Sequence, residues 1–192
     1  MLELKNVSLS YGDLRVLRDV SLRLDPGERI AVMGSSGCGK TSLLRVIAGL
    51  QSPDSGTVEL AARRLSFVFQ EPRLLPWLTA EENVRLVLPD AHQGEDAAAW
   101  LSRFGLSDAA GKLPAELSGG MQQLVSLARA LVCTPDFLLL DEPFKALDAA
   151  AKQNAIATVS DGTDAAIILV THDAREAEAL GCRVIDFSEL NR

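Results

Sequence analysis

One short glycine-rich segment limits what this chain can fold into more than any other part of it. Residues 34–41 read GSSGCGKT and match the pattern G-x-x-x-x-G-K-[ST] in full. The apolar run RIAVM at 29–33 predicts a buried strand before the segment, and apolar residues at helical spacing follow it. A strand, this turn and a helix in that order predict a loop whose backbone N–H groups surround phosphate oxygens. We therefore expect the chain to bind a nucleoside triphosphate.

The residues of this loop are the first candidates for ligand contact. We expect the whole turn and the residue after it to lie against the nucleotide: Gly34, Ser35, Ser36, Gly37, Cys38, Gly39, Lys40, Thr41 and Ser42. The Lys40 ammonium is expected to reach the β and γ phosphates, and the Thr41 hydroxyl to bind Mg²⁺. A glycine-rich turn without a ligand is the alternative, and the flanking strand and helix argue against it.

Two acidic residues follow a second apolar run, FLLLDEP at 137–143. A strand buried on both faces that ends in Asp141 carries this carboxylate to the carboxyl edge of the sheet, where we expect it to serve the metal. Glu142 is then placed to polarise a water molecule, a general-base role worth roughly 10²–10⁴-fold in rate. An Asp-Glu-Pro turn alone would indicate a solvated loop, but a phosphate loop in the same chain favours catalysis.

Three further residues lie at or beyond the ends of predicted strands. His172 follows AAIILVT, and its position favours a γ-phosphate contact over a hydrogen-bonded core residue. Gln70 ends LSFVF, from where it could touch Mg²⁺ or water and report this to the segment that follows. Tyr11 precedes a Gly-Asp turn, and base stacking or simple exposure are about equally favoured by its spacing. His92 has no such placement and is expected to be solvated.

The order of predicted elements indicates an α/β fold with a parallel sheet covered on both faces. Alternating apolar residues in the first thirty positions predict an N-terminal antiparallel β subdomain. We expect a single domain over 1–192, in which 1–70 and 134–192 form the β subdomain and P-loop core. Residues 71–133 are expected to form an inserted helical subdomain, in which Thr79 and Glu82 have capping-box spacing.

Composition excludes several classes of protein. The net charge is −7 and no basic run exceeds two residues, which disfavours a nucleic-acid surface. The longest apolar runs are far too short to span a bilayer, so any membrane role is expected to come through a partner. Three cysteines without metal-ligand spacing, Cys38, Cys133 and Cys182, fit a reducing cytoplasm.

A second Ser/Gly-rich turn, LSGGMQQ at 117–123, opens a predicted helix far from the first. With it, the chain resembles ATP-binding cassette (ABC) ATPase subunits over nearly its whole length and in that family's motif order. The matching features are an aromatic-loop Tyr11, Walker A at 34–41, a Q-loop Gln70, the signature at 117–123, Walker B at 137–143, a D-loop ALD at 146–148 and a switch histidine at His172.

The resemblance implies why the second turn exists. In this family two subunits pair head to tail, and each signature covers the γ-phosphate held by the other subunit. It therefore implies a homodimer in which Ser118, Gly119, Gly120 and Gln122 face the partner's nucleotide and Asp148 lies at the dimer interface.

The chain departs from the family pattern in three places. Leu124 stands where many members have Arg, and Lys145 stands where Ser or Thr usually precedes ALD. The chain also ends about twenty residues after His172, so we expect no C-terminal regulatory domain. The first two departures bear on the dimer contacts, and none of the three removes a catalytic group.

The segment RLLPWLTAEENV at 73–84 resembles the same region of importers for nitrate, sulfonate, taurine and related solutes. In that group it receives a coupling helix of the membrane permease. Leu74, Leu75, Pro76 and Trp77 would supply an apolar wall to that groove or would fill the subdomain's own core, and Leu78 is favoured as core over Leu75.

The resemblance therefore implies an ATPase that uses ATP and Mg²⁺ to drive import of a small solute from the cytoplasmic face of the membrane. Its partners would be a permease bound through residues 71–88, a second ATPase subunit and a solute-binding protein, with no nucleic acid. The alternatives are a soluble ABC ATPase of translation or DNA repair, and a weakly hydrolysing nucleotide switch, which Lys145 leaves open.

Overall fold

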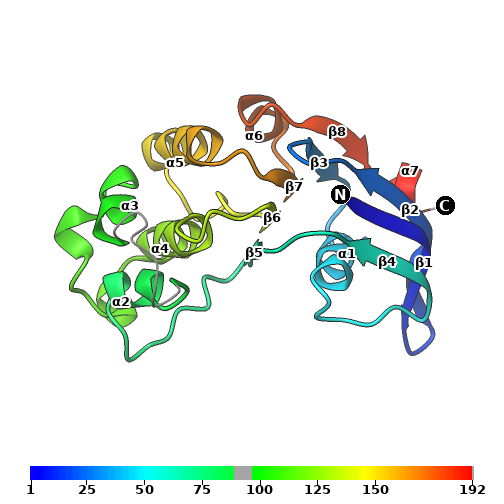
Figure 1. The fold of residues 1–192 in the computed structure, drawn as a ribbon, viewed down its shortest axis with the longest axis horizontal. Helices are drawn as coiled ribbons and strands as arrows, with labels where there is room; N and C mark the ends of the chain where they lie inside the picture. Colours follow the sequence, from blue (N-terminus) through cyan, green and yellow to red (C-terminus); the bar gives the residue numbers. More distant parts are fainter. Residues whose placement is uncertain (89–96, 192) are drawn as a thin grey trace. The chain divides into compact units, whose positions relative to one another are not determined.

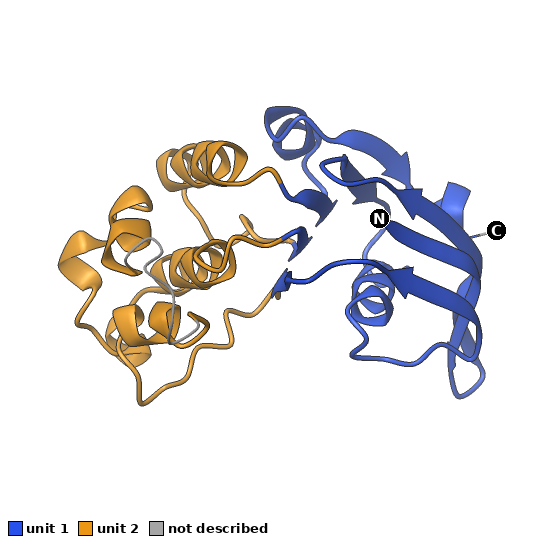
Figure 2. Cartoon of the chain, viewed as in Figure 1, with its two compact units in different colours: residues 1–67, 136–141, 165–192 blue, residues 68–135, 142–164 orange. Residues whose placement is uncertain are grey.

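The computed structural model describes residues 1–88 and 97–191. These residues form two compact units, which Figure 2 distinguishes by colour. Unit 1 contains residues 1–67, 136–141 and 165–192, and unit 2 contains residues 68–135 and 142–164. The segment 142–164 therefore groups with the helical residues, whereas the sequence assigned it to the β subdomain and P-loop core.

Unit 1 begins with an antiparallel sheet of three strands, as the alternating N-terminal pattern predicts. Its strand order is β2 (Leu14–Leu24), β1 (Leu2–Tyr11) and β4 (Ser55–Leu60). One face of β1 and β2 is apolar and at most 9% exposed, and consists of Leu2, Leu4, Val7, Leu9, Leu17, Val20, Leu22 and Leu24. Period-two alternation thus buries one face of this sheet.

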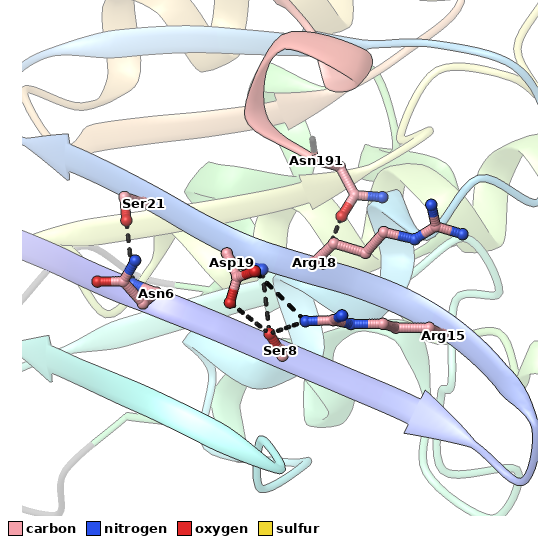
Figure 3. Close-up of polar contacts among 7 residues, drawn as sticks. All are labelled: Asn6, Ser8, Arg15, Arg18, Asp19, Ser21 and Asn191. Atoms are coloured by element: carbon pink, nitrogen blue, oxygen red, sulfur yellow. Dashed lines mark hydrogen bonds and ion pairs between the residues drawn. The ribbon is translucent and has the colours of Figure 1, made fainter.

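The β1–β2 pair contains irregularities at which Asn and Asp adopt left-handed backbone. Asn6 has φ 50° and Asp19 has φ 48°, and the register shifts on both sides of Val7. Asn and Asp adopt this conformation more readily than most residues. The Ser8 hydroxyl oxygen accepts hydrogen bonds from the Asp19 backbone N–H at 3.0 Å and from the Arg15 guanidinium at 3.1 Å (Figure 3). These bonds fix the bulged register.

The second sheet of unit 1 has five strands (Figure 1). In order across the sheet they are β5 (Leu65–Val68), β6 (Phe137–Asp141), β7 (Ala166–Val170), β3 (Arg29–Met33) and β8 (Arg183–Asp186). The pairs β6–β7, β7–β3 and β3–β8 are parallel, and every residue of β6 and β7 is buried. The predicted α/β fold with a parallel sheet is confirmed.

The described part of unit 1 contains the helices α1 (Lys40–Ile47), α6 (Ala174–Ala179) and α7 (Phe187–Leu190). The last was not predicted. After it, the Asn191 side chain accepts a hydrogen bond from the Arg18 N–H at 2.6 Å (Figure 3) and donates one to the Val16 carbonyl at 3.0 Å. The C-terminal helix is therefore tied to β2, next to the phosphate loop.

Unit 2 is helical, which confirms the predicted insert. It contains α2 (Ala80–Arg85), α3 (Ala97–Arg103), α4 (Gly119–Leu131) and α5 (Ala149–Gly162), with single 3₁₀ turns at Ser107–Ala109 and Pro114–Glu116. Trp100, 1% exposed, lies against Gly162, where an added Cβ would come within 2.7 Å of the indole. The predicted capping box of Thr79 and Glu82 is present in full.

None of the helices within residues 1–88 and 97–191 is both long and apolar enough to cross a membrane.

Candidate functional site

The glycine-rich loop of unit 1 joins β3 to α1 and depends on the absence of a side chain at one position. Gly39 has φ 116°, and a Cβ placed there would lie 2.6 Å from a Val16 methyl carbon. Gly37 also has positive φ, 77°, but an added Cβ would meet nothing within 4 Å. Gly39 is thus required by packing against β2, while Gly37 is required only by its backbone conformation.

Lys40, the first residue of α1, folds back over the loop that precedes it. Its ammonium donates hydrogen bonds to the Gly34 carbonyl at 2.8 Å and the Ser35 carbonyl at 2.7 Å, and the residue is 5% exposed. No acidic residue occupies the first turn of α1 in the described chain, and Gly39 provides no side-chain cap. A buried cation therefore lies beside an uncapped helix N-terminus, an arrangement that favours an anionic ligand.

The remaining loop residues divide by exposure. Ser35 and Ser36 are exposed, while Cys38, Thr41 and Ser42 are half-buried. The Cys38 sulfur lies 3.7 Å from the Lys40 ammonium. The loop thus presents its backbone and two hydroxyl groups to solvent while its cation stays inside.

Strand register brings Asp141 to the same edge of the sheet as this loop. Asp141 pairs with Val170 on β7, and Val170 pairs with Val32 on β3, two residues before the loop begins. Two strand spacings of about 4.8 Å each therefore separate Asp141 from β3. Asp141 is 3% exposed, so its carboxylate ends a buried strand at the edge where α/β proteins bind ligands.

His172 lies on the same edge but in a turn rather than in the strand. β7 ends at Val170, so His172 is two residues beyond it and is exposed. The buried Thr171 hydroxyl donates to the Glu176 carboxylate at 2.5 Å and accepts from the Asp173 N–H at 3.1 Å. These two bonds fix the turn that holds His172 outward.

The oxygen ligands of this edge suit a magnesium ion that binds together with phosphate. Thr41 offers a hydroxyl and Asp141 a carboxylate, and both are hard oxygen donors. Among residues 1–88 and 97–191 no group of three or more His, Cys, Asp or Glu side chains could hold a metal ion. Mg²⁺ usually takes one or two carboxylates plus substrate phosphates. The donor set therefore fits Mg²⁺ bound with a nucleotide.

Tyr11 ends β1 and is 46% exposed. It precedes Gly12, which has φ 59°, and Leu14 beyond the turn is 65% exposed. The Tyr11 ring is therefore accessible at a hairpin tip of unit 1. Both interpretations of this residue, base stacking and simple exposure, require an accessible ring.

In unit 2, Gln70 lies two residues beyond β5 and is exposed, so it does not end the strand as expected. Its neighbours are held by α4. The Gln123 side chain donates to the Phe69 carbonyl at 3.4 Å, and Arg129 donates to the Pro72 carbonyl at 3.0 Å and the Arg73 carbonyl at 3.1 Å. Burial lowers the pKa of Arg129, which nevertheless stays charged at neutral pH. The signature helix therefore anchors the segment that follows Gln70.

The signature turn opens α4 with a serine cap. The Ser118 hydroxyl accepts a hydrogen bond from the Met121 N–H at 3.2 Å. Ser118 and Gly119 are exposed and Gly120 is half-buried. The Gln122 amide donates to the Pro114 carbonyl at 2.9 Å and the Leu117 carbonyl at 3.2 Å, so it braces the backbone just before the cap. The most exposed part of the turn is thus Ser118 and Gly119.

Glu142 is the residue after Asp141 in the chain and has φ 46°, an unusual backbone for a residue with a side chain. One of its carboxylate oxygens lies 2.7 Å from the Lys145 ammonium. The Glu142 side chain is 14% exposed and that of Lys145 is 65% exposed. The candidate base therefore carries an ion pair with the lysine that departs from the family pattern.

Two other residues of unit 2 have structural roles. The Asp148 carboxylate caps α5 by accepting from the Ala151 N–H at 2.9 Å. Leu124 is 6% exposed and belongs to the apolar core of the unit. Leucine at position 124 is explained by this burial.

The segment 71–88 exposes apolar side chains. Trp77 is 70% exposed, Leu86 is 55% exposed and Val87 is 40% exposed. Leu74, Leu75 and Leu78 are all half-buried, so exposure does not separate Leu78 from Leu75. The exposure of Trp77 argues against a place in the subdomain's own core, and its role in docking stays a prediction.

A buried amide shapes this segment, and sequence reasoning missed it. Asn83 is fully buried; its Oδ1 accepts from the Leu75 N–H at 2.8 Å. Its Nδ2 lies within 3.1 Å of the carbonyls of Leu75, Leu78 and Thr79. The sequence did contain a signal for this amide, because Asn83 directly follows the capping-box Glu82. A polar residue on the buried face of a short helix needs hydrogen-bond partners.

A hollow of about 530 Å³ occurs elsewhere in unit 1. Its lining includes Arg63, Asp136 and Phe137. Phe137 begins β6, so this hollow lies at the opposite end of the strand from Asp141 and is not part of the candidate site. His92 lies outside the described residues.

Comparison with known proteins gives consistent matches. The family model described as ABC transporter matches residues 17–145. The aliphatic sulfonates import ATP-binding protein SsuB 1 of Agrobacterium fabrum is 45% identical over 96% of this chain and 70% of its own length. The aliphatic sulfonates import ATP-binding protein SsuB of Albidiferax ferrireducens is 44% identical over 96% and 69%. Among solved structures, the dimeric ATP-binding cassette MJ0796 bound to ADP and Pi has a TM-score of 0.84 at 32% identity, covering 97% of this chain and 94% of that one.

Proposed function

Because the chain belongs to the ABC transporter family, we propose that it is the ATP-hydrolysing subunit that energises a membrane importer of a small solute. The observation that carries this function is the phosphate loop with its buried Lys40, on the same sheet edge as Asp141. The named relatives act in aliphatic sulfonate import, which makes an organic sulfonate the proposed cargo class.

Each residue of the loop edge has a proposed task in binding. The backbone N–H groups of residues 34–42 and the Lys40 ammonium hold the phosphates, and Tyr11 stacks on the base. Thr41, Asp141 and Gln70 would hold Mg²⁺, which would supply positive charge beside the phosphate oxygens. The oxygen donors of Thr41 and Asp141 support this assignment.

Hydrolysis requires a base and a group that contacts the γ-phosphate. Glu142 accepts a proton from the attacking water while the water oxygen bonds to the γ-phosphorus and the bond to the ADP oxygen breaks. His172 donates a hydrogen bond to the γ-phosphate. The turn fixed by Thr171 and Glu176 supports this role, because it keeps the imidazole at the carboxyl edge.

The signature turn serves a second subunit. Ser118, Gly119 and Gly120 contact the nucleotide of the partner in a head-to-tail homodimer, with Asp148 near the interface. Gln122 contributes indirectly by bracing the turn. The exposed, serine-capped N-terminus of α4 supports this proposal, and the similar cassette MJ0796 is dimeric.

The exposed apolar side chains of residues 71–88 form the docking surface for the permease. They hold the subunit at the cytoplasmic face of the membrane, and a solute-binding protein completes the importer. Trp77 is the proposed anchor, since aromatic side chains contribute a disproportionate share of interface energy.

The replacement Glu142→Gln tests the proposed function. Hydrolysis should fall by roughly 10²–10⁴-fold because the base is lost, while the affinity for ATP stays close to that of the unchanged protein. The uncleaved ATP should also hold the dimer together, which size-exclusion chromatography with light scattering would show. Hydrolysis at the original rate would remove Glu142 as the base.

The replacement Trp77→Ala tests the docking surface. Because this side chain is 70% exposed, the melting temperature and basal hydrolysis should barely change. Assembly with the co-expressed permease should weaken by roughly thirtyfold or more. Leu14→Ala is the matched control, since Leu14 is an exposed apolar residue in unit 1. Unchanged co-purification of the Trp77 variant would contradict the assignment.

A further inference from the structure

The ion pair between Glu142 and Lys145 is built into a tight turn. The Lys145 N–H donates to the Glu142 carbonyl at 3.3 Å, which closes the backbone over three residues. Pro143 and Phe144, which lie between the two, are both buried and anchor the turn. The Lys145 side chain is 65% exposed, yet its ammonium returns to the Glu142 carboxylate at 2.7 Å.

This contact involves the same carboxylate that the proposed hydrolysis uses. A general base must present an oxygen within hydrogen-bond reach of the water that it deprotonates. Here Oε2 of Glu142 accepts from the Lys145 ammonium, which offers donors only. The ammonium therefore holds one carboxylate oxygen in a fixed direction.

We propose that Lys145 is a positioning residue that restrains Glu142 and slows ATP hydrolysis until its ammonium is drawn away. This inference rests on the proposed function, in which Glu142 is the base. Lys145 directly precedes the segment 146–148, which the dimer proposal places at the interface, so the restraint acts within each subunit, next to the site that a second subunit completes.

The ion pair contributes little to the stability of the fold. An effect of Lys145 on hydrolysis can therefore be separated from an effect on stability. Ion pairs with a largely exposed partner add little to stability, and Lys145 is mostly in solvent. Replacing Lys145 should therefore leave the melting temperature nearly unchanged. An effect of the replacement on hydrolysis then reports on Glu142.

Three variants of the full chain test the restraint: Lys145→Ser, Lys145→Met and Lys145→Arg. Hydrolysis is measured at protein concentrations above which the rate per subunit no longer rises, so that altered dimerisation does not contribute. Lys145→Ser and Lys145→Met should raise kcat about two- to fivefold, the range expected for a part-exposed ion pair, with KM for ATP unchanged. Lys145→Arg keeps a cation and should return the rate to that of the unchanged protein.

The outcomes separate this inference from the function on which it rests. If Lys145→Ser and Lys145→Met hydrolyse at or below the original rate while Glu142→Gln is inactive, the restraint is disproved and the base remains. If Glu142→Gln is fully active, the proposed function fails instead. In the double variant Glu142→Gln with Lys145→Ser, the gain should disappear, and a persistent gain would also overturn the restraint.

Discussion

The phosphate loop of unit 1 and the signature turn of unit 2 are both glycine-rich turns that open a helix, but they carry charge differently. The first supplies Lys40, which is buried and bonded to the carbonyls of its own loop. The signature turn has no basic residue in 117–123 and offers a serine hydroxyl and backbone N–H groups. One turn is therefore complete by itself, and the other is an incomplete anion site.

This difference matters for how each turn binds phosphate. A helix N-terminus alone stabilises an anion by about 0.3–1 kcal/mol at an exposed position, whereas hydrogen bonds to charged groups contribute about 1.5–3 kcal/mol. The phosphate loop should bind nucleotide unaided. The signature turn should act only on a phosphate that another subunit already holds.

Removing the cation of the first turn should have the largest effect. Lys40→Ala should weaken ATP binding by about ten- to a hundredfold, because it removes a charged hydrogen-bond donor. Isothermal titration calorimetry measures this directly. Lys112→Ala, a change at an exposed lysine of unit 2, is the control and should bind ATP normally. Equal affinities in the two variants would mean that the first turn does not depend on its own cation.

Removing the cap of the second turn should act on hydrolysis and not on binding. Ser118→Ala should leave the affinity of the monomer for ATP unchanged but reduce hydrolysis at dimer-forming concentrations by about tenfold. It also removes a helix cap worth about 0.5–2 kcal/mol of stability. Ser118→Thr keeps the hydroxyl and should restore both properties. Weaker ATP binding by the Ser118→Ala monomer would show that the turn acts on its own subunit.

The two glycines of the second turn allow a finer test. A Cβ on Gly120 would lie 3.1 Å from the Ala146 carbonyl, whereas a Cβ on Gly119 would meet nothing within 4 Å. Gly120→Ala should melt about 2–4 °C below Gly119→Ala, corresponding to about 1 kcal/mol of crowding. Differential scanning calorimetry measures this gap. Reduced hydrolysis by a stable Gly119→Ala variant would indicate close approach of a ligand, and full activity would contradict that role.

Most of the fold could be predicted because its signals are local. Continuous apolar runs marked the buried strands β6 and β7, and Thr79 with Glu82 marked the start of α2. Likewise, the phosphate loop was predicted from residues 34–41 and their flanks alone. Each of these features depends on side chains within a few positions of one another.

The features that were missed depend on contacts between distant or irregular segments. Asn191 bonds to the backbone at Val16, 175 positions away, so no local pattern predicts α7 and its attachment. The grouping of 142–164 with the helical unit likewise follows from packing of α5 against α4. The ion pair of Lys145 depends on the left-handed backbone of Glu142, which the letters DEPFK do not reveal.

The fully buried amide of Asn83 has a consequence for how such a surface changes over evolution. It binds the backbone, not the side chains, of residues 75–79. The path of that loop is therefore held through its backbone, so the exposed side chain of Trp77 can be exchanged while the loop keeps its path. A lineage that retains this single amide can change the side chains that the loop exposes by point substitutions, without having to rebuild the scaffold beneath them.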